Sequence, residues 1–142
     1  MLKQKMDAED VLQSSFVDVF SKMDSFKYQS TIGAWIKRIV INNCINHLKK
    51  KRMFFDELDD KMQVIDNGEE VQNHDYQLQL VNDAIMELPD GYRVVLTMYL
   101  MEGYDHKEIG EVLGISESTS KSQYSRAKTK LKELIYSASA QY

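Results

Sequence analysis

The strongest constraint on the fold is a glycine turn between two helical segments near the C-terminal end of the chain. Asp105 stands where a helix would begin and Glu108 follows three residues later, which is the spacing of a capping box. Gly114 stands where that helix must end, because a residue without a Cβ atom enters the left-handed C-terminal conformation at little cost. Ser116 can cap a second helix through the amide of Thr119. This layout predicts a helix-turn-helix.

The second helix of this motif carries most of the positive charge. Residues 117–133 hold five basic and two acidic side chains. In DNA-binding proteins the second helix of a helix-turn-helix lies in the major groove, and basic side chains neutralise the phosphates. Two packed helices with a solvated basic face would show the same pattern, so this alternative stays open.

The rest of the chain is typical of an all-α protein. Its 142 residues include one proline and six glycines, and no segment alternates apolar and polar residues as a strand would. Apolar periodicity predicts helices at 7–23, 34–52, 76–88 and 90–101. Pro89 separates the last two, because proline ends one helix and fits the first turn of the next. We therefore expect two small helical domains, the second a four-helix unit that ends in the helix-turn-helix.

Charge divides the chain into parts, although its net charge is only −4. Residues 34–52 hold six basic and no acidic side chains, whereas residues 53–75 hold eight acidic side chains and one lysine. The acidic segment lacks helical periodicity, which predicts a flexible linker between domains at 1–52 and 76–142. Local basic patches, rather than net charge, decide how a protein meets phosphates, so nucleic acid remains a candidate partner.

Composition and motifs argue against several other classes of protein. A single cysteine excludes an internal disulfide. No run of about 18 apolar residues predicts a membrane span, and the N-terminus lacks the apolar core of a signal peptide, so we expect a cytoplasmic protein. The chain has no glycine-rich phosphate loop, HExxH or CxxC motif, and its three histidines lie in different segments. We therefore expect neither an enzyme nor a bound metal or cofactor.

The N-terminal half has polar and aromatic groups suited to single-stranded nucleic acid. Phe26 and Tyr28 lie in a polar loop at 24–33. They can stack on an unpaired base, although anchoring a loop to the core is the commoner role of such rings. In the following helix, Asn42, Asn43 and Asn46 can hydrogen-bond base edges. Buried contacts between helices would equally explain several asparagines in one helix, where asparagine is a mediocre helix former.

Together these motifs resemble those of the extracytoplasmic-function sigma factors of bacterial RNA polymerase. The family's region 2.2 is similar to DAEDVLQSSFVDVF, its regions 2.3 and 2.4 to FKYQSTIGAWIKRIVINNCINHLKKKR, and its region 4 to AIMELPDGYRVVLTMYLMEGYDHKEIGEVLGISESTSKSQYSRAKTKLKEL. These segments occur in the family's order and cover nearly all of the chain except the acidic segment. The resemblance implies a transcription initiation factor that binds core RNA polymerase and promoter DNA, with an anti-sigma factor as a further partner.

The resemblance also implies roles for individual residues. Asp10 and Gln13 would face the clamp helices of the polymerase. The minus-ten element would be read by residues of the loop and the next helix: Phe26, Tyr28, Ser30, Thr31, Lys37, Arg38, Asn42 and Asn46. Of these, one or both of the basic residues, Lys37 and Arg38, can be structural. The minus-thirty-five element would be contacted by the last helix: Thr119, Lys121, Ser122, Ser125, Arg126 and Lys128.

The chain departs from the family pattern in three ways. Ser120 stands where the family usually has valine, which predicts weaker packing, and Gln123 replaces a usual basic residue. The chain also begins at the region 2.2 helix, so an apolar stripe lacks its usual cover. The stripe consists of Leu12, Phe16, Val19, Phe20 and Met23. An exposed stripe favours association, so we expect either a homodimer through the N-terminal helices or partial disorder there.

Two other functions remain open from the sequence. A stand-alone helix-turn-helix regulator would bind duplex DNA without engaging polymerase, and binding to core polymerase distinguishes it from a sigma factor. A helical protein-interaction module would use its basic faces only for solubility, and its binding to duplex DNA would show almost no salt dependence.

Overall fold

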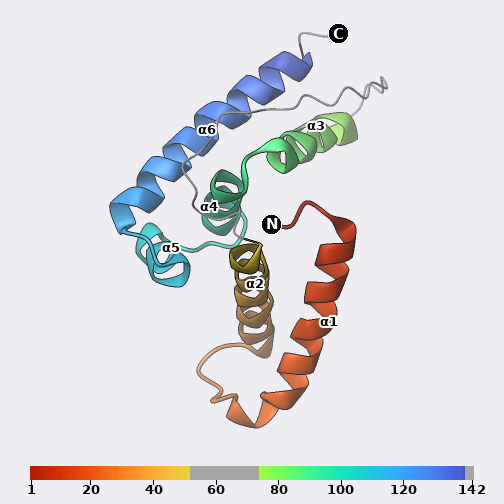
Figure 1. The fold of residues 1–142 in the computed structure, drawn as a ribbon, viewed down its shortest axis with the longest axis vertical. Helices are drawn as coiled ribbons and strands as arrows, with labels where there is room; N and C mark the ends of the chain where they lie inside the picture. Colours follow the sequence, from red (N-terminus) through yellow and green to blue (C-terminus); the bar gives the residue numbers. More distant parts are fainter. Residues whose placement is uncertain (52–73, 140–142) are drawn as a thin grey trace. The chain divides into compact units, whose positions relative to one another are not determined.

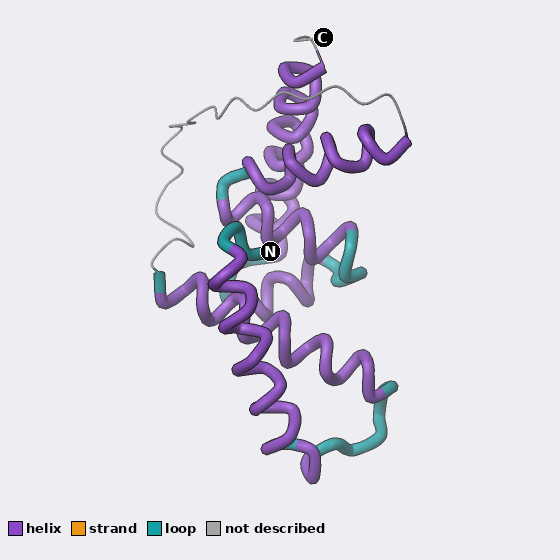
Figure 2. Tube along the Cα trace, turned by 90° about the vertical axis from the view of Figure 1, so that its right-hand side faces the viewer, coloured by secondary structure: helices purple, strands orange, loops and turns teal. Residues whose placement is uncertain are grey.

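The computed structural model describes residues 1–51 and 74–139, in which every regular element is a helix (Figures 1 and 2). The elements are α1 (Lys5–Ser21), the 3₁₀ helix η1 (Met23–Ser25), α2 (Ile32–Lys50), α3 (His74–Glu87), α4 (Asp90–Leu100), α5 (His106–Leu113) and α6 (Glu117–Ser139). The prediction of an all-α fold is confirmed. No helix in the described ranges is long and apolar enough to cross a membrane.

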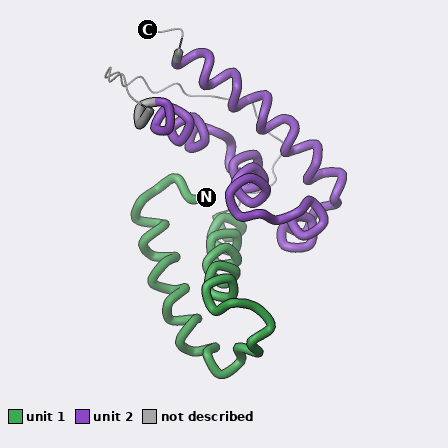
Figure 3. The backbone as a smooth tube through the Cα atoms, turned by 180° about the vertical axis from the view of Figure 1, so that it is seen from behind, with its two compact units in different colours: residues 1–54 green, residues 55–142 purple. Residues whose placement is uncertain are grey.

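The chain divides into two compact units, residues 1–54 and 55–142 (Figure 3). The predicted acidic linker at 53–75 falls almost entirely outside the described residues, so its flexibility stays a prediction. In unit 1, α1 and α2 run in opposite directions and are joined through η1 and a loop (Figure 1). In unit 2, α3, α4 and α5 all pack against α6.

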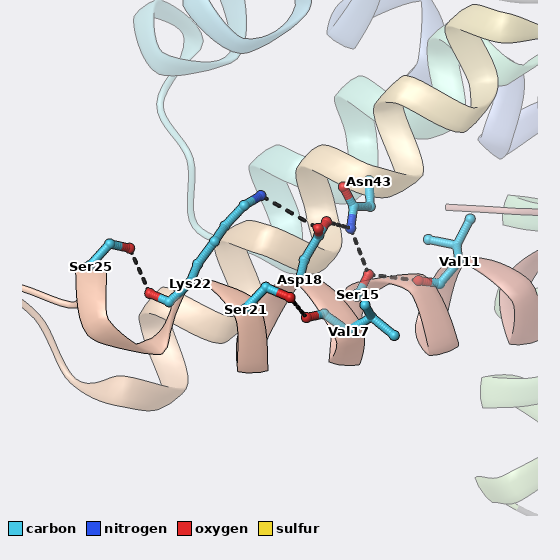
Figure 4. Close-up of polar contacts among 8 residues, drawn as sticks. All are labelled: Val11, Ser15, Val17, Asp18, Ser21, Lys22, Ser25 and Asn43. Carbon is cyan, nitrogen blue, oxygen red and sulfur yellow. Dashed lines mark hydrogen bonds and ion pairs between the residues drawn. The ribbon is translucent and has the colours of Figure 1, made fainter.

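A hydrogen-bond network sets the register of α1 against α2 (Figure 4). The buried Ser15 hydroxyl donates to the carbonyl oxygen of Val11 at 2.6 Å. Asn43 Nδ2 donates to Ser15 Oγ at 3.1 Å and to Asp18 Oδ2 at 2.8 Å. The hydrogen bond from Asn43, helped by Lys22, holds the pKa of the Asp18 carboxyl below its usual value. Because a buried polar atom without a partner is costly, sliding one helix along the other would be penalised.

A second polar contact joins the start of α1 to the end of α2. The Asp7 carboxylate lies 2.6 Å from Lys51 Nζ and 3.4 Å from His47 Nε2. The hydrogen bond from Lys51 is the main cause that lowers the pKa of Asp7. Polar contacts therefore join α1 and α2 at two places, near the middle of the helices and at the end of the pair opposite the connecting loop.

The core of unit 2 surrounds α4, where six consecutive residues, 93–98, are buried. Leu88, Leu96 and Ala127 belong to one buried apolar cluster that joins α4 to α6. The guanidinium of Arg93 is also buried, and it is satisfied by an ion pair with Asp90 and a 2.7 Å hydrogen bond to the carbonyl oxygen of Leu88. A buried charge is tolerated when it is paired and hydrogen-bonded in this way.

Two apolar stripes differ from the sequence-based prediction. Of the predicted stripe along α1 and η1, Val19 is buried, but the other four members are exposed. The face toward α2 passes through Val11 and Ser15 instead, since Ser15 satisfies its hydroxyl inside the helix. The apolar periodicity that predicts a helix at 76–88 includes Leu78, which is 61% exposed, whereas Ala84 on α3 and Leu88 just after it are buried. Association through the exposed α1 stripe stays a prediction.

Removing the amide of Asn43 should destabilise unit 1. Asn43→Ala deletes the donor to both Ser15 and Asp18, and we expect it to lower the free energy of unfolding by about 1–2 kcal/mol. Asn42→Ala is the matched control, because Asn42 is exposed and the change in helix propensity is the same. Urea unfolding followed by fluorescence of Trp35, the single tryptophan, measures both. Equal midpoints for the two variants would contradict the structural role of Asn43.

The contact of Asp7 with Lys51 should make the stability of unit 1 depend on acid pH. Because the folded-state pKa of Asp7 is lowered, its contribution is fully present above the unfolded pKa of about 3.9 and is lost as the pH falls through the folded value. Asp7→Asn should therefore lower the Trp35-detected urea midpoint at pH 7, and the gap to wild type should close below about pH 4. A gap of the same size at pH 7 and pH 3 would show that the carboxylate charge is not its origin.

Candidate nucleic-acid interface

The helix-turn-helix predicted from the sequence is confirmed in its local geometry. The Asp105 side chain accepts a hydrogen bond from the Glu108 amide, and the Glu108 side chain accepts one from the Asp105 amide, both at 2.8 Å. Gly114 ends α5 in the left-handed conformation with φ of +73°. Ser116 Oγ accepts a hydrogen bond from the Thr119 amide at 3.0 Å and so caps α6. These caps fix where the turn begins and ends.

Gly110 lets the turn approach α5 closely. A Cβ atom at this position would lie 2.8 Å from the carbonyl oxygen of Ile115. The amides of Gly114 and Ile115 both donate to the Gly110 carbonyl, at 2.9 and 3.0 Å. Glycine inside a helix costs about 1 kcal/mol relative to alanine, and this contact explains its presence. An isolated glycine inside a helical pattern is the sequence signal of such a close approach.

Below α6, a polar and aromatic cluster supports Ser120. The side chain of Ser120 is buried, and its Oγ lies 3.0 Å from Nδ1 of His106. The His106 ring stacks on Tyr99 at 4.5 Å and meets the edge of the Tyr124 ring at 5.5 Å. Weaker packing was predicted at Ser120, and the structure gives its hydroxyl a hydrogen-bond partner in His106. This partner could not be predicted from local spacing, because the two residues belong to different helices. Gln123, which stands where the family usually has a basic residue, is half-buried.

The outward face of α6 is rich in hydroxyl groups. Ser118, Ser122, Ser125 and Thr129 are exposed and recur at intervals of three and four residues, which places them on one side of the helix. Ser122 Oγ donates within α6 to the carbonyl oxygens at 118 and 119, and Thr129 Oγ1 donates to that of Ser125. Arg126 is exposed beside this face. Thr119 lies at its edge and is half-buried.

The lysines predicted to contact DNA have neighbours on α6. Lys121 Nζ lies 2.6 Å from Glu117 Oε1, and their mutual hydrogen bond lowers the pKa of Glu117 and raises that of Lys121. Lys128 Nζ lies 4.7 Å from the centroid of the Tyr124 ring. No ion-pair partner of Arg126 occurs among residues 1–51 and 74–139.

In unit 1, the loop before α2 holds one aromatic ring outward. Phe26 is half-buried, with its ring centroid 4.8 Å from that of Tyr28 and 5.3 Å from that of Trp35. Tyr28 is 87% exposed, and among the described non-glycine residues it alone has a positive φ, of 56°. A left-handed backbone costs a bulky residue about 1–2 kcal/mol. Such strain together with exposure marks Tyr28 as a candidate for function.

The polar residues near this loop have separate environments. Thr31 caps α2 by accepting a hydrogen bond from the Ala34 amide at 3.2 Å, so its hydroxyl has a structural use, and Ser30 Oγ lies 3.4 Å from the Thr31 carbonyl oxygen. Arg38, Asn42 and Asn46 recur every four residues and are exposed, so they share one face of α2. Helical spacing places Lys37, which is also exposed, on a different side of α2.

The candidate polymerase contacts lie on a solvent-facing side of α1. Asp10 and Gln13 are exposed and are flanked by Met6 and Val17, which are 76% and 65% exposed. Their spacing of three and four residues places all four on one face, away from α2. Within the parts of the chain that the structure describes, no three His, Cys, Asp or Glu side chains gather into a set that could hold a metal ion.

Both units match models of known protein families. Residues 1–53 match the model of Sigma-70 region 2, and residues 78–131 match that of Sigma-70, region 4. The fold is similar to that of the sigma factor RpoE from Bartonella quintana, solved in complex with the anti-sigma factor NepR. The TM-score is 0.62 at 22% identity, covering 95% of this chain and 84% of RpoE.

Sequence relatives point to the same family. The ECF RNA polymerase sigma factor SigM of Bacillus subtilis is 31% identical over 136 residues, which are 94% of this chain and 83% of the relative. SigM of Mycobacterium tuberculosis is 30% identical over 130 residues, which are 91% of this chain but only 64% of the relative. The two region models occur in the order that the sequence analysis expected, and the chain belongs to the extracytoplasmic-function sigma factors of RNA polymerase.

Proposed function

We propose that this chain is a transcription initiation factor that binds core RNA polymerase and directs it to promoter DNA. α6 would read the minus-thirty-five element as duplex, and unit 1 would hold the opened minus-ten element. The observation that carries the proposal is the difference between the two surfaces. The capped α6 offers hydroxyls and a guanidinium for a groove, whereas unit 1 offers an exposed aromatic ring in its loop and exposed amides on α2 for unstacked bases.

At the minus-thirty-five element, Arg126 would supply the main base contact. A guanidinium can donate two hydrogen bonds to O6 and N7 of guanine, which is a strongly discriminating contact in the major groove. Ser122 and Ser125 can donate to or accept from several bases, so they discriminate less. Lys121 and Lys128 would contact phosphates, and Thr119 would position the start of the helix.

At the minus-ten element, Tyr28 would stack on an unpaired base, and Phe26 would support its ring from below. Asn42 and Asn46 would hydrogen-bond base edges of the open strand, with Arg38 on the same face beside a phosphate. The described contacts favour supporting roles for Ser30 and Thr31, whose hydroxyls lie against loop and helix backbone. Lys37, on another side of α2, is the weaker candidate of the basic pair.

Asp10 and Gln13 would contact the polymerase clamp, with Met6 and Val17 adding apolar contact around them. RpoE of Bartonella quintana was solved with an anti-sigma factor, and we propose a partner of the same kind for this chain. Such a partner would have to exclude either polymerase or promoter DNA.

Arg126→Ala should weaken binding to promoter duplex by about 1–3 kcal/mol, or about 5- to 150-fold. Arg126→Lys is the matched control because it keeps the charge and loses the planar fork. We expect the lysine variant to recover the salt dependence but not the preference for the promoter sequence. Fluorescence anisotropy with promoter duplex and a duplex of scrambled sequence measures both. An alanine variant that binds as tightly as wild type would contradict the role of Arg126.

Tyr28→Ala should spare duplex binding by α6 but impair promoter opening, because each base stacked on an aromatic ring contributes about 1–3 kcal/mol. Tyr28→Phe keeps the ring and should open the promoter like wild type, while Asn42→Ala should impair opening. Run-off transcription with core polymerase measures activity, and permanganate reactivity of unpaired thymines measures opening.

If the Tyr28→Ala variant opens the promoter as wild type does, Tyr28 does not contact the minus-ten element as proposed. If wild type never starts transcription with core polymerase, the proposal of a complete initiation factor fails, although duplex binding by α6 could survive as the activity of a regulator.

A further inference from the structure

We propose that Glu117 limits the affinity of α6 for DNA by competing with phosphate for the ammonium group of Lys121. The inference rests on the proposed function of α6 as the helix that enters the groove. It makes Glu117 an affinity-determining residue, in addition to the residues expected to contact DNA directly.

The two side chains form a close pair at the end of α6 that would meet DNA. Glu117 is the first residue of α6, and Lys121 follows one turn later on the same side. Their charged atoms lie 2.6 Å apart, and both side chains are at least half exposed. The shared hydrogen bond lowers the pKa of Glu117 and raises that of Lys121, so both groups stay charged at neutral pH.

This pairing reduces the contribution that Lys121 can make to DNA binding. A basic side chain strengthens binding mainly by neutralising a phosphate and releasing a counterion. A Glu–Lys pair has no net charge, so it releases none, and the carboxylate also repels the phosphates. Lys128 differs, because the Tyr124 ring leaves the charge of its ammonium group uncompensated. Lys121 is thus the lysine on this side of α6 whose contribution depends on an acidic neighbour.

The pair can be broken without disturbing the fold. An exposed ion pair on one helix adds little to stability, and glutamine keeps the size of the side chain. Glu133→Gln provides a matched control, since Glu133 pairs with Lys130 at 3.2 Å on the same helix, far from its N-terminal end. That substitution makes the same change in net charge at a place that the groove would not reach.

The experiment measures binding of the full chain to promoter duplex by fluorescence anisotropy over a series of salt concentrations. The variants are Glu117→Gln, Lys121→Gln, both together, and Glu133→Gln. We expect Glu117→Gln to tighten binding by about 2- to 10-fold at low salt and to steepen the log–log salt slope by about 0.9, the value for one more neutralised phosphate. In the Lys121→Gln background the same change should have a much smaller effect and leave the slope unaltered, and Glu133→Gln should behave like wild type.

Three outcomes would overturn the inference. Equal tightening by Glu117→Gln with and without Lys121 would mean simple repulsion of DNA by the carboxylate. Equal tightening by Glu133→Gln would mean a general effect of net charge. Weaker binding, confined to duplexes with a cytosine at one position, would mean that Glu117 accepts a hydrogen bond from that base. A wild-type chain without salt-dependent DNA binding would instead refute the proposed function, so the two failures are distinguishable.

Discussion

The hydrogen bonds from Asn43 to α1 decide which surfaces of unit 1 remain available. They place Asn43 between the helices, and helical geometry then turns Asn42 and Asn46 outward with Arg38. The same contact places Ser15 inside, so the opposite sides of α1 face solvent. One polar network between two helices therefore separates a structural asparagine from two that are free to meet a ligand. A purely apolar contact would fix this rotation less strictly, because it is not directional.

In unit 2 the corresponding constraint is the close approach at Gly110. The missing side chain lets the turn pack against α5, and the hydrogen bond between His106 and Ser120 then joins α5 to α6. Both contacts act on the buried side of α6. They determine its rotation and leave the hydroxyls and Arg126 on the solvent side, which is the side that the proposed contact with duplex DNA requires.

Local features could be predicted from the sequence, and contacts between helices could not. The capping box at Asp105 and the left-handed Gly114 depend on residues at most four positions apart, so their spacing is sufficient evidence. The choice of Asn43 over its neighbours as the buried asparagine depends on α1, 25 to 28 residues away. The strained backbone of Tyr28 gives no sequence signal, because tyrosine rarely adopts a positive φ. The ion pair of Glu117 and Lys121 has the local i, i+4 spacing, so it could have been predicted from the sequence.

In the proposed interface, the charges on α6 would favour selectivity between DNA sequences over strength of binding. Affinity for any DNA sequence grows with the number of neutralised phosphates, whereas discrimination comes from contacts with base edges. In the proposed interface, a lysine whose charge is compensated by Glu117 would add less to the affinity for any DNA sequence, and the fork of Arg126 would add to the discrimination between bases. With the charge of Lys121 compensated in this way, α6 would bind non-specific DNA weakly. The proposed contact of α6 with the minus-thirty-five element would then be modest, so stable engagement would require the second contact proposed for unit 1, together with polymerase.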